Sequence, residues 1–179
     1  MNDQEPLQML MDAQNRIQAM SMVHEKLYQS TRLSDVNIME YIEDLAMALV
    51  ASYHREGQVT LKLDMADIRF NIDMAVPCGL IINELMTNSL KYAFPGGRPG
   101  EVSIALHGLG GKKVQLTFAD NGIGVPDGFD LKQVKSLGLK LLTNLATQQL
   151  HGQVRLQCDH GCRYELTFES NGTLEESQA

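Results

Sequence analysis

Cysteine is scarce in this sequence, and no long apolar run occurs in it. Its 179 residues include three cysteines, Cys78, Cys158 and Cys162, without the paired spacing of a disulfide framework or a four-ligand zinc site. This usage fits a reducing compartment. No N-terminal signal pattern is present, and no apolar run approaches the ~20 residues that span a bilayer. We therefore expect a cytoplasmic chain that makes no membrane contact of its own.

An excess of basic residues is also missing. Lys and Arg number 15 against 22 Asp and Glu, which gives a net charge of -7, and no basic stripe is evident. This balance predicts no nucleic-acid partner. It does not exclude an anionic ligand, because nucleotide sites use backbone N–H groups, helix N-termini and a metal ion. Apolar residues at 44% and charged residues at 21% are typical of one globular domain with a short appendage.

Hydrophobic periodicity predicts four helices and six strands. The helices are expected over residues 7–28, 38–54, 73–93 and 137–150, and the strands over 59–63, 68–72, 102–106, 114–118, 153–158 and 163–168. In the third helix Asp73 is the expected cap, and Pro77 is tolerated in the first turn.

Strands that come in hairpin pairs between helices favour an α+β fold over a doubly wound parallel sheet. We expect a two-layer sandwich of a mixed sheet with helices on one face, preceded by an N-terminal helix. A domain boundary is placed near residue 34, between a helical part over residues 1–34 and a main domain over 35–172. A polar tail follows over 173–179.

Three polar residues of the third helix share one face. Glu84, Asn88 and Lys91 lie at positions i, i+4 and i+7, on a helix whose other face must be buried. Such a trio beside a core indicates a site. A solvated helix face with a Glu-to-Lys neighbour pattern fits the same spacing equally well.

Two glycine-containing segments offer their backbone to a ligand. Residues 120–124, Asp-Asn-Gly-Ile-Gly, directly follow a strand and let the chain pass close to a planar group, although these residue types also form ordinary turns. Residues 136–140, Ser-Leu-Gly-Leu-Lys, open a helix behind a loop. Free N–H groups and the positive end of the helix dipole are then available to phosphate.

Together, these segments resemble the ATP-binding domain of sensor histidine kinases, which has the Bergerat (GHKL) fold. Residues 83–92 look like its N box, 120–124 like its G1 box, 136–140 like a reduced G2 box and 161–168 like its final glycine-containing strand motif. The stretch from Arg16 to Tyr28 resembles the helix after the phospho-acceptor in kinases of the HWE type and their relatives. Residues 1–34 therefore look like the second part of a dimerisation hairpin.

The resemblance implies a metal and phosphate site on the third helix. Asn88 would be the Mg²⁺ ligand through its carbonyl oxygen. Glu84 would be the catalytic residue near the γ-phosphate, either as a partner in the metal shell or as a base for a water molecule. Lys91 and Tyr92 would face the phosphate or ribose side.

The resemblance also implies a pocket for the base. Asp120 would accept a hydrogen bond from the adenine amine, and Gly122 and Gly124 would admit the ring. Residues 125–135 would form a mobile lid over ATP. Two further residues would offer backbone N–H groups to phosphate, namely Gly138 and Leu139.

Two departures from the family pattern concern the affinity for nucleotide. The G2 region has one glycine, Gly138, where many relatives have several. Cys162 stands after Gly161, where the family commonly has Thr, and a thiol is a poor replacement for that hydroxyl.

The implied function is that of the ATP-binding catalytic domain of a two-component sensor histidine kinase, a transferase that uses ATP and Mg²⁺. The H box, the motif that contains the phospho-acceptor histidine, is not found where the family pattern has it, so the acceptor histidine would lie outside this chain. His24-Glu25 is a candidate substitute, because a histidine followed by an acidic residue on a helix has the appearance of an H box.

The implied partners are a response regulator, the chain's own or a partner's phospho-acceptor helix, and a second copy in a homodimer. Two alternatives are a serine/threonine kinase of the anti-sigma type and a dimeric interaction module without nucleotide.

Overall fold

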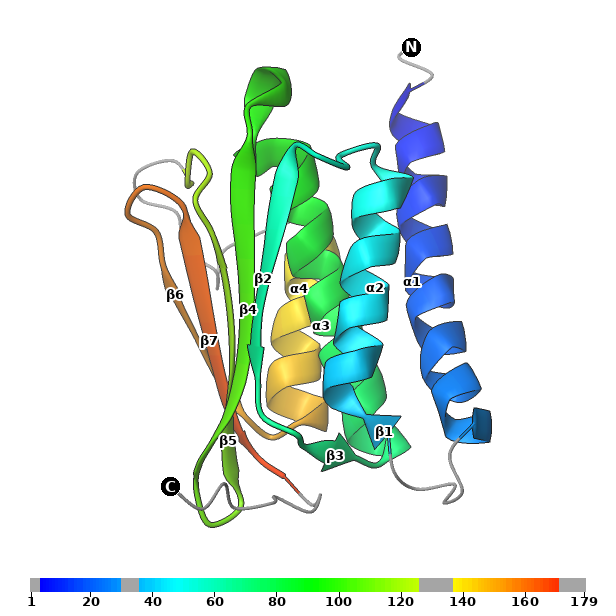
Figure 1. Ribbon diagram of the computed structural model, residues 1–179, viewed down its shortest axis with the longest axis vertical. Helices are drawn as coiled ribbons and strands as arrows, with labels where there is room; N and C mark the ends of the chain where they lie inside the picture. Colours follow the sequence, from blue (N-terminus) through cyan, green and yellow to red (C-terminus); the bar gives the residue numbers. More distant parts are fainter. Residues whose placement is uncertain (1–3, 30–35, 126–136, 171–179) are drawn as a thin grey trace.

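Strands with alternating apolar side chains form a five-stranded sheet. The computed structural model describes residues 4–29, 36–125 and 137–170. The main strands in it are β2 (Val59–Met65), β4 (Gly100–Gly110), β5 (Lys113–Asp120), β6 (Gln153–Gln157) and β7 (Cys162–Glu169). Their order is β2-β4-β5-β7-β6, in which β2 and β4 are parallel and the other neighbours antiparallel. The predicted mixed sheet is confirmed (Figure 1).

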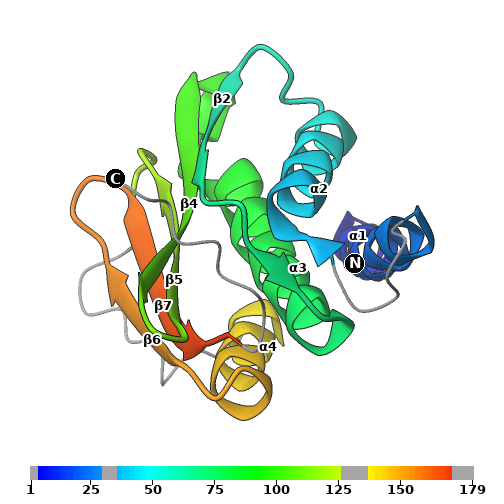
Figure 2. The same cartoon turned by 60° about the horizontal axis from the view of Figure 1, so that its bottom comes forward.

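The described helices form a second layer on one face of the sheet. The α-helices are α1 (Gln4–Gln29), α2 (Ile38–Ser52), α3 (Ile72–Asn88) and α4 (Leu137–Asn144), and π-helical turns over Ser89–Ala93 and Leu145–Gln149 extend α3 and α4. A short 3-10 turn, Pro95–Gly97, lies between α3 and β4. Figure 2 shows α1 on the outer side of this layer, where it packs against α3 and α2. The predicted two-layer α+β sandwich is therefore confirmed. None of the described helices is both long and apolar enough to cross a membrane.

The helix α3 lies at the centre of the core. Ile81, Ile82 and Met86 are almost completely buried, because the sheet, α1 and α2 surround this helix. The neighbouring helix α2 presents one apolar stripe to it, as a three- and four-residue spacing dictates. Its first turn is fixed by Asn37, which accepts a hydrogen bond from the Glu40 N–H at 3.2 Å. The rigid packing of α3 fixes the side chains at its C-terminal end.

The outer helix α1 is attached through a tyrosine of α2. The Tyr41 hydroxyl donates a hydrogen bond to the carbonyl oxygen of Ala19 at 2.9 Å, and both residues are fully buried. Gly79 of α3 makes room for this contact, because a Cβ atom there would collide with the Tyr41 ring and hydroxyl. Three helices therefore meet at one side chain.

The predicted strand over residues 68–72 is wrong in extent and partner. Only Arg69–Phe70 (β3) is extended, and it pairs antiparallel with Val36–Asn37 (β1) in a separate two-stranded sheet. The alternation in the sequence reflects the burial of Ile68 and Phe70 beside the helices. Local periodicity reports which side chains are buried and does not identify the pairing partner.

The predicted start of α3 is also wrong. The helix begins at Ile72, and its cap is Asn71, whose side chain accepts from the Met74 N–H at 3.2 Å, in place of Asp73. Pro77 consequently lies in the second turn and not in the first. It leaves the Asp73 carbonyl without a helical donor, but Asp73 is exposed, so water can satisfy this group. The domain boundary proposed near residue 34 lies outside the described residues.

Candidate functional site

A cavity of about 630 Å³ opens between α1, the C-terminal end of α3, the end of β5 and the start of α4. This volume is in the range of small-molecule sites. All the predicted site residues except Gly122 line it: Glu84, Asn88, Lys91, Tyr92, Asp120, Gly124, Gly138 and Leu139. Three motifs that are separate in the sequence thus meet around one space.

The polar face of α3 points into this cavity. Glu84, Asn88 and Lys91 all contribute to its wall, as their spacing predicts. The alternative of a solvated face is wrong for Glu84, which is 3% exposed. Its neighbour Asn83 is also buried and donates from Nδ2 to Glu84 Oε1 at 3.2 Å. Asn88 is partly buried, and none of the described residues provides a hydrogen-bond partner for its side chain.

Two charged residues of α1 complete the cavity wall, and neither was predicted from the sequence to be a site residue. Arg16 binds Glu84 with two hydrogen bonds, Nε to Oε1 at 2.6 Å and Nη2 to Oε2 at 2.8 Å. This contact to Glu84 raises the pKa of Arg16, so the guanidinium is firmly charged. Asp12 accepts from Lys91 Nζ with both carboxylate oxygens, at 2.6 and 2.8 Å. The only signal in the sequence is that Asp12 and Arg16 share a face of α1.

A tyrosine at the end of α2 joins this charged cluster. The Tyr53 hydroxyl donates to Asp12 Oδ1 at 3.2 Å and accepts from Asn15 Nδ2 at 3.4 Å. The Lys91 ammonium lies 6.0 Å from the centre of the Tyr53 ring. Burial raises the pKa of Tyr53 to about 12, so the hydroxyl is a neutral donor at physiological pH. The cluster therefore connects α1, α2 and the turn after α3.

The carboxylate of Asp120 is held at the other side of the cavity. Its Oδ2 accepts from the Ser89 hydroxyl at 2.7 Å. Its Oδ1 accepts from the backbone N–H of Gly122 at 2.9 Å and more weakly from that of Cys162 at 3.4 Å. Ser89 lies inside the N-box segment. Its pairing with Asp120 could not be recognised in the sequence, because it depends on the turn after α3 lying beside the end of β5. These bonds fix the orientation of the carboxylate before any ligand arrives.

The three predicted glycines have different surroundings. Gly122 does not line the cavity; it is packed so closely against Ala93 that a Cβ atom would collide with that residue. Gly124 does line it and has a φ of +75°, which disfavours any side chain. At Gly138 a Cβ atom would run into the Glu84 carboxylate. Beyond Val125, which lines the cavity, the predicted lid lies outside the described residues.

Cys162 and Tyr164 of β7 form the floor next to Asp120. Burial, followed by the influence of the neighbouring Cys158 thiol, raises the pKa of Cys162. Burial likewise raises the pKa of Tyr164. Both side chains are therefore neutral, and this part of the wall is suited to a flat, largely apolar group.

Both parts of the chain match known protein families. Residues 75–172 match the family described as histidine kinase-, DNA gyrase B-, and HSP90-like ATPase, and residues 1–53 match a family described as histidine kinase. Sensor histidine kinase PdtaS of Mycobacterium tuberculosis is 27% identical over 151 residues, which cover 83% of this chain and 29% of that protein. Blue-light-activated histidine kinase 2 of Erythrobacter litoralis is 24% identical over 136 residues, which cover 73% of this chain and 38% of that protein.

The fold is similar to that of a solved histidine kinase domain. The histidine kinase domain of a blue-light activated histidine kinase from Erythrobacter litoralis superposes with a TM-score of 0.79 at 20% identity, over 89% of this chain and 75% of that chain. At this identity the likeness concerns the fold. The chain spans 29% of the length of the mycobacterial relative and 38% of the length of the curated Erythrobacter relative.

Proposed function

The chain belongs to the family of histidine kinase-, DNA gyrase B- and HSP90-like ATPases, and on that basis we propose that it binds Mg-ATP in the cavity beside α3. It is the catalytic ATP-binding part of a two-component sensor histidine kinase. The main support for the site is that residues of three separate motifs line one cavity of suitable volume.

The metal and phosphate end of the proposed site is formed by α3. Asn88 offers an amide oxygen, partly buried and without a side-chain partner among the described residues, which suits a hard cation such as Mg²⁺. The metal would neutralise phosphate charge when bound. Lys91 supplies a cation to the phosphates with Tyr92 beside it, and Glu84 acts close to the γ-phosphate. Gly138 and Leu139 contribute backbone N–H groups.

The adenine end of the proposed site is centred on Asp120. Its oriented carboxylate has lone pairs left to accept a hydrogen bond from an exocyclic amine. Gly124 leaves room for the ring, and the neutral side chains of Cys162 and Tyr164 form the floor. Gly122 supports the site indirectly, because it lets the loop close onto Ala93, whose carbonyl accepts from the Ile123 N–H at 3.0 Å.

The phosphoryl group is proposed to pass to a histidine outside this chain and then to a response regulator. None of the chain's five histidines, all within the described residues, lines the cavity. His24 is exposed on α1, eight residues beyond Arg16, or about 12 Å along the helix axis.

The proposed domain organisation follows the family resemblance. Residues 1–34 would be the second part of a dimerisation hairpin, and residues 35–172 would be the ATP-binding domain. The working form would be a cytoplasmic homodimer.

Calorimetric titration with ATP tests the binding site. The unaltered chain should bind ATP with a strong dependence on Mg²⁺, and Asn88→Ala should lose that dependence. The matched control is Asn144→Ala, because Asn144 is exposed at the C-terminal end of α4 and lies outside the cavity. Mg²⁺-dependent binding that survives in Asn88→Ala would show that the metal ligand is another residue.

Labelling with γ-³²P ATP tests the phosphotransfer. Acid-labile label should be absent from the isolated chain and appear on an added phospho-acceptor domain of the histidine kinase type. Acid-labile label on the chain itself that disappears in His24→Ala would identify His24 as the acceptor. Acid-stable label on an added protein would instead support a serine/threonine kinase.

A further inference from the structure

Within the described wall of the cavity, the two cationic side chains are already occupied by carboxylates. Arg16 is bound by Glu84, and Lys91 is bound by Asp12. Glu84 and Lys91 both belong to the proposed nucleotide site, whereas Asp12 comes from α1, outside the nucleotide-binding motifs. The contact between Asp12 and Lys91 therefore places a foreign anion at the proposed phosphate end.

The contact between Asp12 and Lys91 involves both oxygens of the carboxylate. Both oxygens of Asp12 lie within hydrogen-bond distance of Lys91 Nζ, at 2.6 and 2.8 Å. Such charge-assisted hydrogen bonds are short and strong. The Lys91 side chain is 11% exposed, and the Tyr53 ring lies beside its ammonium group. A second anion at Lys91 must therefore share the ammonium group with Asp12 or displace it.

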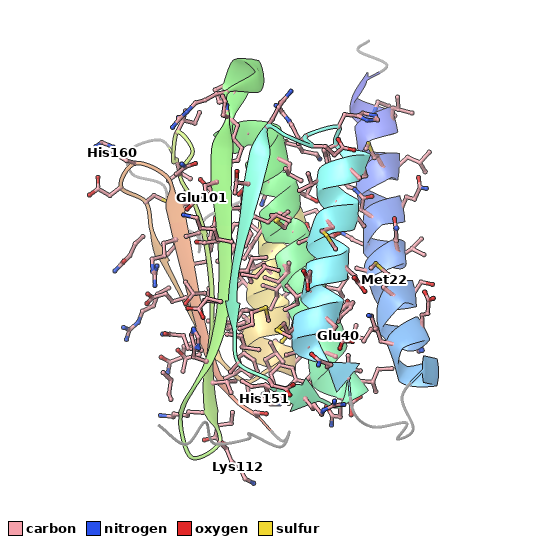
Figure 3. All side chains as sticks on the ribbon, viewed as in Figure 1. Met22, Glu40, Glu101, Lys112, His151 and His160 are labelled. Carbon is pink, nitrogen blue, oxygen red and sulfur yellow. The ribbon has the colours of Figure 1, made fainter. Side chains whose placement is uncertain are left out.

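The attachment of α1 has further contacts remote from the cavity. The Tyr41 hydroxyl binds the Ala19 carbonyl at 2.9 Å. Lys26 forms ion pairs with Asp44 at 2.7 Å and with Glu40 at 3.7 Å. Figure 3 labels Glu40 in the lower part of α2 and Met22 on the facing helix α1. Removing the charge of Asp12 alone therefore leaves the other attachments of α1 intact.

We propose that Asp12 is an internal competitor of the nucleotide phosphates for Lys91, so that docking of α1 and binding of ATP oppose each other. The inference rests on the proposed function of the cavity. Linkage makes the opposition reciprocal: whatever holds α1 in place weakens ATP binding, and ATP weakens the hold on α1 by the same factor. The helix that resembles a dimerisation hairpin would in this way control nucleotide affinity.

The substitution Asp12→Asn tests this competition, because it removes the charge and keeps the shape and an acceptor for Tyr53. The Kd for Mg-ATP should fall by about tenfold, since a charge-assisted contact is lost from the competing state only. The Kd for adenosine, which has no phosphates, should stay the same. The matched control is Asp44→Asn, which removes the other close Lys–Asp pair of α1 and should change neither Kd.

An unchanged or weaker affinity for Mg-ATP in Asp12→Asn would overturn the inference, and so would an equal gain for adenosine. If neither ligand binds the unaltered chain, the proposed function fails and the inference fails with it. Amide hydrogen exchange on the unaltered chain is a second measurement that requires no variant. Saturating Mg-ATP should speed exchange over residues 9–16 of α1, and unchanged exchange there would also overturn the inference.

Discussion

Arg16 of α1 and Glu84 of α3 form a two-point ion pair inside the wall of the cavity, with N–O distances of 2.6 and 2.8 Å. The Glu84 side chain is 4% exposed and that of Arg16 is 21% exposed. A carboxylate that is buried without a counter-charge is costly. The buried position of Glu84 therefore depends on α1, and a helix outside the nucleotide-binding motifs becomes part of the site.

Removing the guanidinium should destabilise the chain more than removing another charge of α1. For Arg16→Ala we expect a loss of about 2–3 kcal/mol in the free energy of unfolding, because Glu84 is left buried and unpaired. For Lys26→Ala we expect less than about 1 kcal/mol, since exposed ion pairs contribute little. The Lys26 partners Asp44 and Glu40 are 42% and 57% exposed. Urea denaturation followed by circular dichroism measures both losses, and equal losses would contradict the special role of Arg16.

The element order was predictable because it depends on local patterns. Three- and four-residue spacing of apolar side chains gave α1 and α2, and alternation gave the strands β4, β5, β6 and β7. The partner of residues 69–70 was not predictable, because their pairing with Val36–Asn37 depends on how the helices pack. The start of α3 was missed because Asn71 and Asp73 are both good capping residues, and only the backbone distinguishes them.

The residues of the candidate site also divide into those that could be predicted from local patterns and those that could not. Glu84, Asn88 and Asp120 could be found from the sequence, because each belongs to a motif with fixed local spacing. Asp12 and Arg16 could not be found, because their partners are 79 and 68 residues away and are determined by the docking of a separate helix. Gly122 is a third case. Its motif could be recognised in the sequence, but its close contact with Ala93 could be identified only from the folded structure.

The attachment of α1 should weaken at alkaline pH through Tyr53. The pKa of its hydroxyl is raised to about 12 by burial, above the ordinary value of 10.0. The folded state therefore favours the protonated form, and the resulting stability is fully present below pH 10 and lost as the pH rises through 12. At pH 8 the unaltered chain should be more stable than Tyr53→Phe by about 1 kcal/mol, for the lost hydrogen bond to Asp12.

Urea denaturation of both proteins between pH 8 and pH 11.5 checks this expectation. The difference in the free energy of unfolding between the unaltered chain and Tyr53→Phe should shrink from about pH 10 upward. Other groups titrate in both proteins and cancel in the difference. A difference that is constant across the range would show that the Tyr53 hydroxyl is not held in its neutral form by the fold.

Ser89 provides the test of how Asp120 recognises its ligand. Its hydroxyl donates to Asp120 Oδ2 at 2.7 Å, so Ser89→Ala leaves the carboxylate held through Oδ1 alone and loosens its orientation. If Asp120 binds the adenine amine, the affinities for ATP and for adenosine should both fall, by roughly tenfold or less, because one orienting hydrogen bond is lost. This pattern differs from that of Asp12→Asn, which should affect only ligands with phosphates.

Ser52→Ala is the matched control, because the Ser52 hydroxyl donates to the Leu49 carbonyl at 3.1 Å outside the cavity. Weaker binding of ATP with unchanged binding of adenosine in Ser89→Ala would place Asp120 at the phosphate end and overturn the proposed orientation of the nucleotide.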